Sequence, residues 1–501
     1  MNSHCQYNTF PTTQQRTETR RFQNRWMHLA VFTAILGNLS FGYALVYTSP
    51  VIPELERSPD PQLQLDNYKA SFFESIFTLG VMFGGLTTML LNDLLGRKLT
   101  IMVSSVPSVL GFAIMGSAQE VWMLDLGRAL TGIAGGMLSG TVPIYIAEIS
   151  VAKMRGRMGV GPQIMLVLGT LLLYALALVL SWRWLAVVGA FIPVVMITLM
   201  WYMPESPRHL ISKRRDTEAI EALAWLRGPD ANYQLEYKEI EDSLSRDVSQ
   251  FSCSELSQRH IYKPILISVF MRVFQQLSGI TVVLVNMQII FDSTAVILAG
   301  GDDAVLVGIV RLFSVSLAAW LMDKAGRRRL LFVSGIIMSI SMLSLGVYIK
   351  LNELKSNQTS SNMPFENTTH LTAEHPLQHK TTGLLTIIPL ISVMVFIFGY
   401  ALGWGPITWL MMSEILPLKV RGFASGVCVA VSWITAFVLT EFFLQVKHSF
   451  GLAVPFLFFC AVSTLGIIFT AFCIPETRRR TLEQIQDSFQ NPTAPRVVET
   501  N

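Results

Sequence analysis

The sequence predicts an all-α membrane protein in which twelve transmembrane helices form two six-helix pseudo-repeats. The first observation is composition, because a chain of 501 residues with 51% hydrophobic and only 14% charged residues is too apolar for a water-soluble globule. The second is the recurrence of apolar runs about 20 residues long, the length that crosses a membrane as a helix. The third is a set of signatures that occur twice in the same order. A β-barrel would need short segments of alternating polarity, and these runs are apolar on all sides.

The predicted spans follow one another along the whole chain. They occupy residues 28–50, 71–91, 99–117, 121–147, 158–179, 184–203, 263–291, 303–322, 330–349, 383–412, 423–445 and 453–474. The first six spans form an N-terminal half at 28–203, and the last six form a C-terminal half at 263–474. Residues 204–262 are predicted to be a helical cytoplasmic linker, and residues 1–27 and 475–501 to be cytoplasmic tails.

Three signatures support the division into halves, since each recurs after the corresponding span of the other half. They are NDLLGRK (92–98) with MDKAGRR (322–328), AEISVAKMRG (147–156) with SEILPLKVRG (413–422), and PES (204–206) with PET (475–477). Parallel repeats of this kind are the layout of a large class of transporters, in which the substrate binds between the halves.

Basic residues predict the orientation, because Lys and Arg in short loops remain cytoplasmic. The loops after spans 2, 4, 8 and 10 carry Arg97, Lys98, Lys153, Arg155, Arg157, Lys324, Arg327, Arg328, Arg329, Lys419 and Arg421. The short loops of the opposite side carry only Arg57, Lys69, Arg183 and Lys447. Both termini are therefore predicted to be cytoplasmic. The net charge of +4 mostly reflects this asymmetry, so no nucleic-acid partner is expected.

The long loop predicted at 350–382 lies on the outer side. It holds two N-glycosylation sequons, Asn357 in NQT and Asn367 in NTT. Two sequons in a loop that the basic residues already place outside predict a glycoprotein.

Charged residues near the cytoplasmic helix ends predict a gate. The expected members of this salt-bridge network are Asp93, Arg97, Arg128, Glu148, Arg155, Glu205, Arg208, Asp323, Arg327, Glu414, Arg421 and Glu476. One exposed pair contributes only about 0–1 kcal/mol, but a cluster that forms in one conformation can bias a two-state equilibrium. The alternative is that the basic residues only anchor the topology.

These signatures resemble the sugar porter family of the major facilitator superfamily. Further runs carry the resemblance: GRALTGIAGG (127–136), PESPRHL (204–210), RVFQQLSGI (272–280) and GWGPITW (403–409). The likeness covers nearly the whole chain and extends to the facilitated glucose transporters of solute carrier family 2. It implies a monomeric carrier in the lipid bilayer, with a hexose as its substrate and no cofactor.

Two adjacent glutamines, Gln275 and Gln276, are unusual in the apolar span 7. They lie about 18 Å from its cytoplasmic end, near the middle of the membrane. An unpaired amide in apolar surroundings costs roughly 2–7 kcal/mol, so each must face another helix or a wet cavity. A helix–helix clamp is possible for one of them. For both together a sugar is favoured, because an amide can donate to and accept from a hydroxyl, and the resemblance implies the same role.

The resemblance implies further substrate contacts in spans 5 and 10. Gln163 and Trp409 match sugar-contacting positions of the family. An indole suits the task, because its broad apolar face fits the C–H face of a pyranose ring. Gly403, Gly405 and Pro406 interrupt the same span as Trp409 and predict that it bends.

Departures from the family pattern predict a low affinity for glucose. Thr281 and Arg311 replace two asparagines of glucose carriers, and Ala401 replaces a glutamate. Arg311 lies about 18 Å from the cytoplasmic end of span 8, and an unpaired guanidinium there would cost at least about 2.5 kcal/mol. It is therefore expected to face the cavity, where either an intramolecular partner or the solute meets it. Thr281 and Arg311 join the predicted substrate site.

The predicted function is facilitative hexose uniport by alternating access between the halves. Proton-coupled members of the family have an acid directly after FGY, where this chain has Ala44. A proton-coupled symporter and a sugar sensor with little transport are the alternatives. An enzyme is not expected, since the histidines lie in loops or near span ends, and ATP-driven pumping is not expected, since no P-loop is present. The first 25 residues lack a Leu-Leu pair, which predicts the cell membrane, with an endosomal or lysosomal membrane as the alternative.

Overall fold

A computed structural model describes residues 25–151, 154, 158–228, 233–246, 258–294, 302–361, 387–416, 421–477 and 489. Over these residues the secondary structure is helical. Eleven of the described helices are long and apolar enough to cross a membrane, and the shorter apolar helix Gly161–Ala177 lies between the fourth and fifth of them.

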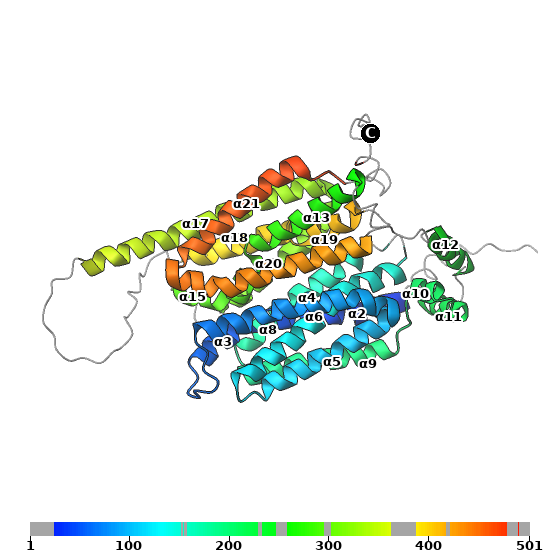
Figure 1. Ribbon diagram of the computed structural model, residues 1–501, viewed down its shortest axis with the longest axis horizontal. Helices are drawn as coiled ribbons and strands as arrows, with labels where there is room; N and C mark the ends of the chain where they lie inside the picture. The colour runs from blue at the N-terminus through cyan, green and yellow to red at the C-terminus, as the bar shows by residue number, and fades with distance from the viewer. Residues whose placement is uncertain are drawn as a thin grey trace, which may run out of the picture.

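The helices form two groups that lie side by side (Figure 1). The N-terminal group comprises α2 (Arg25–Leu45), α3 (Thr48–Glu56), α4 (Asn67–Leu94), α5 (Arg97–Gly116), α6 (Val121–Ile149), α8 (Gly161–Ala177) and α9 (Trp182–Trp201). The C-terminal group comprises α13 (Arg259–Leu277), α14 (Ile280–Val285), α15 (Met287–Thr294), α16 (Asp302–Ala325), α17 (Arg327–Ser361), α18 (Ile388–Leu402), α19 (Pro406–Ile415), α20 (Arg421–Phe450) and α21 (Ala453–Cys473).

Three short helices connect the groups at one end of the bundle. They are α10 (Pro207–Ser212), α11 (Asp216–Arg227) and α12 (Tyr233–Arg246). We call this the linker end, and the opposite end, which carries α3 and α15, the distal end (Figure 1).

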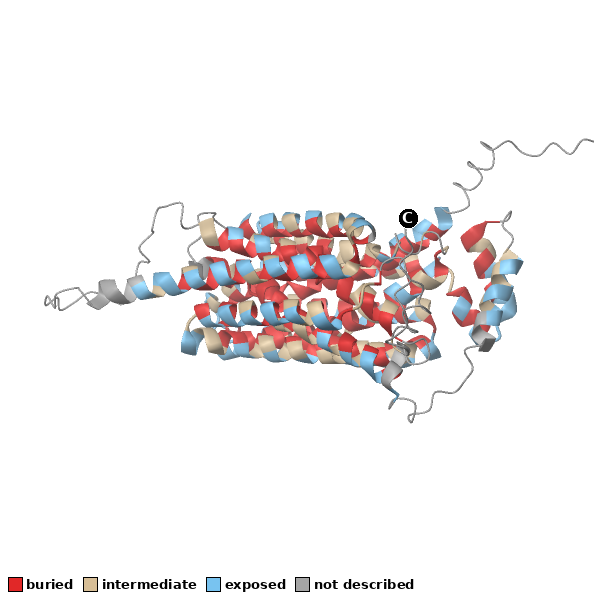
Figure 2. Ribbon diagram, turned by 90° about the horizontal axis from the view of Figure 1, so that it is seen from above, coloured by how far each residue is buried: buried red, intermediate tan, exposed pale blue. Residues whose placement is uncertain are grey.

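The bundle has an apolar outer surface, and its interior buries charged side chains among an apolar core. Large apolar side chains face outward, and Phe191, Trp201 and Phe472 are 65%, 69% and 85% exposed. Charged side chains lie within the bundle, where Arg128 and Arg272 are 0% and 1% exposed. Exposed residues accordingly cover the outer faces of the helices, around a buried interior (Figure 2). Lipid is the solvent that suits such a surface, because apolar groups lose nothing there whereas charges must turn inward.

Close packing in the N-terminal group explains the glycine-rich run 127–136. A Cβ on Gly132 would lie 2.3 Å from the carbonyl oxygen of Phe77, and one on Gly84 would lie 2.0 Å from that of Ile133. Only glycine therefore lets α4 and α6 approach at backbone contact, which is a common way to pack helices in membranes.

Three of the predicted spans are broken helices. The expected break in span 10 is present, since α18 ends at Leu402 and α19 begins at Pro406. Breaks in spans 1 and 7 were not predicted. Span 7 turns at Gly279, whose φ of +86° suits glycine alone, and a Cβ there would lie 2.4 Å from Phe459.

The segment 350–382, which was predicted to be a long outer loop, begins as a helix. Helix α17 continues to Ser361 and projects beyond the bundle at the distal end (Figure 1). The backbone of Asn357 is therefore helical. The helix continues through the polar residues that follow its apolar part. The side chain of Asn357 and all of Asn367 lie outside the described residues.

Candidate functional site

Gln275 joins α13 to the break between α18 and α19. Its Nε2 donates to three oxygens: Tyr400 Oη (3.0 Å), Trp404 O (2.8 Å) and Gly405 O (3.3 Å). Its Oε1 accepts from the guanidinium of Arg272. Trp404 and Gly405 lie directly before α19, so these hydrogen bonds tie α13 to the break.

Gln276 joins α13 to two other helices of the same group. Its Nε2 donates to Ser432 Oγ of α20 at 3.2 Å, and its Oε1 accepts from Thr281 Oγ1 of α14 at 2.7 Å. Gln276 and Thr281 are buried, with 6% and 7% exposed. In this conformation both glutamines act as clamps between helices, and their contact with sugar stays a prediction.

Arg272 is a member of this cluster that the sequence analysis missed. It is 1% exposed, and its guanidinium carbon lies 3.8 Å from the centre of the Trp409 ring. A cation over an indole face is attracted by the ring quadrupole. One face of the predicted sugar platform is therefore already covered. An arginine within an apolar span was the signal that could have identified it.

Arg311 lies where the two groups meet. It is 4% exposed, and its Nη1 donates to Thr170 Oγ1 of α8 at 3.4 Å. Thr170 thus supplies an intramolecular partner, although the Nε of Arg311 has none. Gln163 precedes Thr170 by seven residues, so it shares that face of α8 about 10 Å nearer the linker end.

The same face of α8 continues to the distal end. Val167 packs against Val315 and Ala401 of the C-terminal group, and Tyr174 Oη donates to Leu284 O at 2.8 Å. Helix α8 therefore presents one continuous face to the other group.

A latch of polar side chains closes the distal end. Its members, which we call the distal latch, are Glu74 and Ser75 of α4, Asn286 between α14 and α15, and Glu441 of α20. Asn286 Nδ2 donates to Glu74 Oε1, and Ser75 Oγ donates to Glu441 Oε2 at 2.5 Å. Glu74 and Asn286 are 1% and 0% exposed, and Glu74 Oε2 has no partner. All these contacts would break if the groups separated here.

At the linker end, the predicted charges form an ion-pair network within the N-terminal group. Arg97 Nη2 lies 2.9 Å from Glu148 Oε1. The backbone N–H groups of Arg97 and Lys98 donate to the carboxylate of Glu205 at 3.0 and 3.1 Å. This network ties the ends of α5 and α6 to the segment after α9.

The C-terminal group repeats this arrangement. Arg327 Nη2 lies 3.5 Å from Glu414 Oε1, and the backbone N–H of Arg327 donates to Glu476 Oε1 at 3.1 Å. The contacts named here lie within one group in each case, so they stiffen that group.

His209 and Glu205 extend the first network outside the membrane spans. Arg97 Nη1 lies 2.9 Å from His209 Nδ1. Burial, and then the charge of Arg97, lower the pKa of His209, so the neutral ring can accept from the guanidinium. Burial raises the pKa of Glu205, although three backbone N–H groups stabilise its charged form.

The assignment of Arg128 to this network is wrong. Arg128 lies twenty residues before Glu148 on α6, about 30 Å away and toward the distal end. Its Nη1 donates to Ala44 O at 2.6 Å, and its guanidinium carbon lies 4.3 Å from the centre of the Phe77 ring. It is therefore a buried structural charge.

The other predicted members of the network fall at the linker end or outside the description. Asp93 and Arg208 are exposed at the linker end. Arg155 and the side chains of Asp323 and Arg421 lie outside the described residues.

Comparisons with known proteins agree with this arrangement. The family model described as "Sugar (and other) transporter" matches residues 29–489. The human protein named solute carrier family 2, facilitated glucose transporter member 6, is 52% identical over 491 residues, which cover 97% of this chain and 96% of the relative. Member 8 from mouse is 40% identical over 475 residues, covering 94% of this chain and 96% of the relative. The resemblance to solute carrier family 2 is confirmed.

Solved structures confirm the fold. The proton:xylose symporter XylE of the major facilitator superfamily, bound to 6-bromo-6-deoxy-D-glucose, superimposes with a TM-score of 0.74 at 23% identity, covering 93% of this chain and 100% of that chain. The inward-open conformation of XylE from E. coli gives 0.73 at 22% identity, covering 92% and 99%. The predicted twelve-helix architecture is that of this superfamily.

Proposed function

Because this chain belongs to the sugar transporter family, we propose that it is a facilitative hexose carrier that works by alternating access between its two helix groups. Its relatives are transporters rather than enzymes, as the sequence predicted. The observation that carries the proposal is the set of polar contacts along the boundary between the two groups, which we call the seam. Arg311 meets Thr170 at its middle, and the distal latch closes one end.

Rigid-body motion suits the distribution of the polar contacts. The Arg97 and Arg327 networks each hold one group together, whereas the distal latch joins the groups through hydrogen bonds. Opening the distal end would exchange those bonds for bonds to water. By the positive-inside argument, we assign the linker end to the cytoplasm and the distal end to the outer side. The carrier is then closed toward the outside in this conformation.

The sugar site is proposed in the C-terminal group beside the seam. Gln276 and Thr281 would exchange their mutual hydrogen bond for bonds to sugar hydroxyls, with Gln163 and Arg311 facing them. Gln275 would act by holding the helix break. Because Thr281 and Arg311 replace two asparagines of glucose carriers, this site has fewer amide side chains for sugar hydroxyls, which supports weak binding of glucose.

Uptake of radiolabelled hexose into proteoliposomes tests this proposal. Gln276→Ala is expected to reduce uptake strongly, whereas Ser432→Ala removes only the clamp partner and is expected to reduce it less. Each variant's folding is checked by its elution in detergent. Equal losses in the two variants would show that Gln276 acts only as a clamp, and no uptake by the parental protein would favour the sugar sensor.

A proton-coupled symporter is the second candidate, and the observation that favours it is Glu74. This carboxyl is buried between the groups, where it accepts a hydrogen bond from Asn286 and lies within the electrostatic reach of Arg128. Uniport remains our first proposal, because Ala44 replaces the acid of proton-coupled relatives. Uptake that accelerates under an imposed inward proton gradient, at a fixed sugar gradient, would reverse the order.

We further propose a monomeric protein of the cell membrane with an N-glycan on the outer side. The projection of α17 beyond the distal end supports a glycan near Asn357 or Asn367. Loss of the glycosidase-sensitive mobility shift in a variant with Asn357→Gln and Asn367→Gln tests the glycan. Surface biotinylation tests the location, and recovery of almost none of the protein would favour the endosomal or lysosomal membrane.

A further inference from the structure

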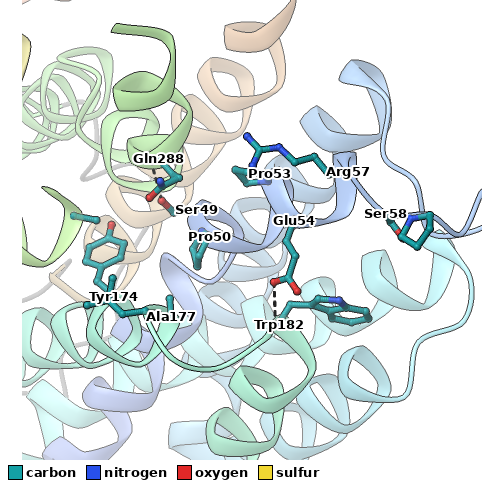
Figure 3. A pocket seen from close by; sticks show the side chains of 13 residues that line it. Ser49, Pro50, Pro53, Glu54, Arg57, Ser58, Tyr174, Ala177, Trp182 and Gln288 are labelled. Carbon is teal, nitrogen blue, oxygen red and sulfur yellow. Dashed lines mark hydrogen bonds between the residues drawn. The ribbon is translucent and has the colours of Figure 1, made fainter. Parts of the chain in front are cut away.

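A cavity of about 640 Å³ lies at the distal end, lined by residues of α3, α8 and α15 and by Trp182 at the start of α9 (Figure 3). Its walls come from both groups, since Ser49, Glu54 and Trp182 belong to the N-terminal group and Gln288 to the C-terminal group. This volume is typical of sites that hold small molecules. None of the residues proposed for the transport site lines this cavity.

The lining offers the chemistry of a carbohydrate site. Glu54 Oε2 accepts from the backbone N–H of Trp182 at 3.2 Å, which fixes the carboxylate beside the indole (Figure 3). The guanidinium carbon of Arg183 lies 4.7 Å from the centre of the Trp182 ring, so it covers one face of this indole, which is 8% exposed and lines the cavity with the rest of its surface. An indole accepts the C–H face of a sugar, while a carboxylate accepts hydrogen bonds from its hydroxyls.

The charge balance favours a neutral ligand. Glu54 and Arg57 are the charged residues among those that line the cavity, so their formal charges cancel. The hydroxyl of Ser49 and the amide of Gln288 add neutral donors and acceptors. Many hydrogen-bonding groups without net charge match a polyhydroxylated molecule better than an ion.

The cavity depends on the closed distal end. The backbone N–H of Gln288 donates to Ser49 Oγ at 3.3 Å, and Tyr174 Oη donates to Leu284 O at 2.8 Å. Both contacts join the groups at the cavity wall. When the groups separate here, the wall from the C-terminal group moves away, so a ligand that touches both groups binds the closed state more tightly.

We propose that this cavity is an accessory carbohydrate site, which takes a mono- or disaccharide on the distal face and thereby holds that end closed. It is distinct from the transport site, and only its effect on transport rests on the proposed function. Its binding reaction can be measured in a protein that transports nothing.

In the test, the purified full chain in lipid nanodiscs is titrated with maltose, and calorimetry measures the affinity of binding. Glu54→Gln keeps the shape of the side chain and an oxygen that can accept from Trp182, but removes the charge from the acceptor. It is expected to weaken maltose binding about tenfold, because hydrogen bonds to a charged group are the stronger ones. Trp182→Ala is expected to weaken it at least as much.

Two control variants separate this site from others. Glu120→Gln alters another exposed carboxylate, which accepts from the indole N–H of Trp122 at 2.8 Å and does not line the cavity, so binding should be unchanged. Gln276→Ala alters the proposed transport site and should also leave it unchanged. The proposal is overturned if maltose shows no saturable binding, if Glu54→Gln binds like the parent, or if Gln276→Ala alone abolishes binding.

Discussion

Replacing Asn286 by alanine is expected to unlatch the distal end. The substitution removes the amide that donates to Glu74 Oε1, and Glu74 Oε2 has no partner to compensate. The buried carboxyl, 1% exposed, would then lack a hydrogen bond on either oxygen. Such a loss costs about 1–3 kcal/mol, which corresponds to a shift of about 5- to 150-fold in the closed-to-open equilibrium.

The assay measures access to the seam behind the latch. Thr78 follows Glu74 by one helical turn on α4 and is 1% exposed, so Thr78→Cys reports opening through its reaction with a membrane-impermeant thiol reagent. In this background Asn286→Ala should increase the reaction rate by about the same factor, provided that the open state is the minor one. The chain without Thr78→Cys gives the rate of the native cysteines.

A matched variant separates the hydrogen bond from the charge. Glu74→Gln retains an oxygen that accepts from Asn286, so it should react close to the parental rate, as should the surface variant Glu120→Gln. Parental reactivity of Asn286→Ala would refute the reasoning, because the latch would then contribute nothing to closure.

Three further predictions concern other parts of the molecule. Arg311→Asn removes a buried charge with one weak partner, Thr170, and should raise glucose uptake at low glucose; unchanged uptake and an unchanged competition profile would make Arg311 purely structural. The lowered pKa of His209 means that the folded state disfavours its protonation, so thermal stability in detergent should fall as the pH drops below about 6.5, and His209→Gln should remove most of that fall. A pH profile that His209→Gln leaves unaltered would assign the effect elsewhere. Gly279→Ala forces a Cβ to within 2.4 Å of Phe459 at a φ of +86°, so it should lower stability by about 1–3 kcal/mol, measured as an earlier melting transition than for Ala→Gly changes on exposed helix faces.

Hydropathy and the repeated signatures were enough to predict the architecture, because a lipid environment restricts which sequences can cross it. Each span must be apolar and must satisfy its backbone internally, so a helix is evident from composition alone. The signatures around Arg97 and Arg327 likewise predicted two equivalent networks, and Glu148 and Glu414 occupy equivalent places in them. Counting along span 4 would also have excluded Arg128, since it lies near the distal end of its helix.

Only the tertiary structure decided which polar groups meet. Glu74 and Asn286 are separated by 212 residues, and Arg272 lies over Trp409 from a different helix. The sequence places each residue on its own helix and at a depth, but spans that are equally apolar on all sides do not specify which face meets which neighbour. The breaks in spans 1 and 7 also could not be predicted from one span alone. A break in a transmembrane helix is tolerated where neighbouring helices and side chains satisfy the freed backbone groups, and those neighbours are set by the tertiary structure. Packing between helices therefore fixes the pairing, and the pairing determines how this carrier closes.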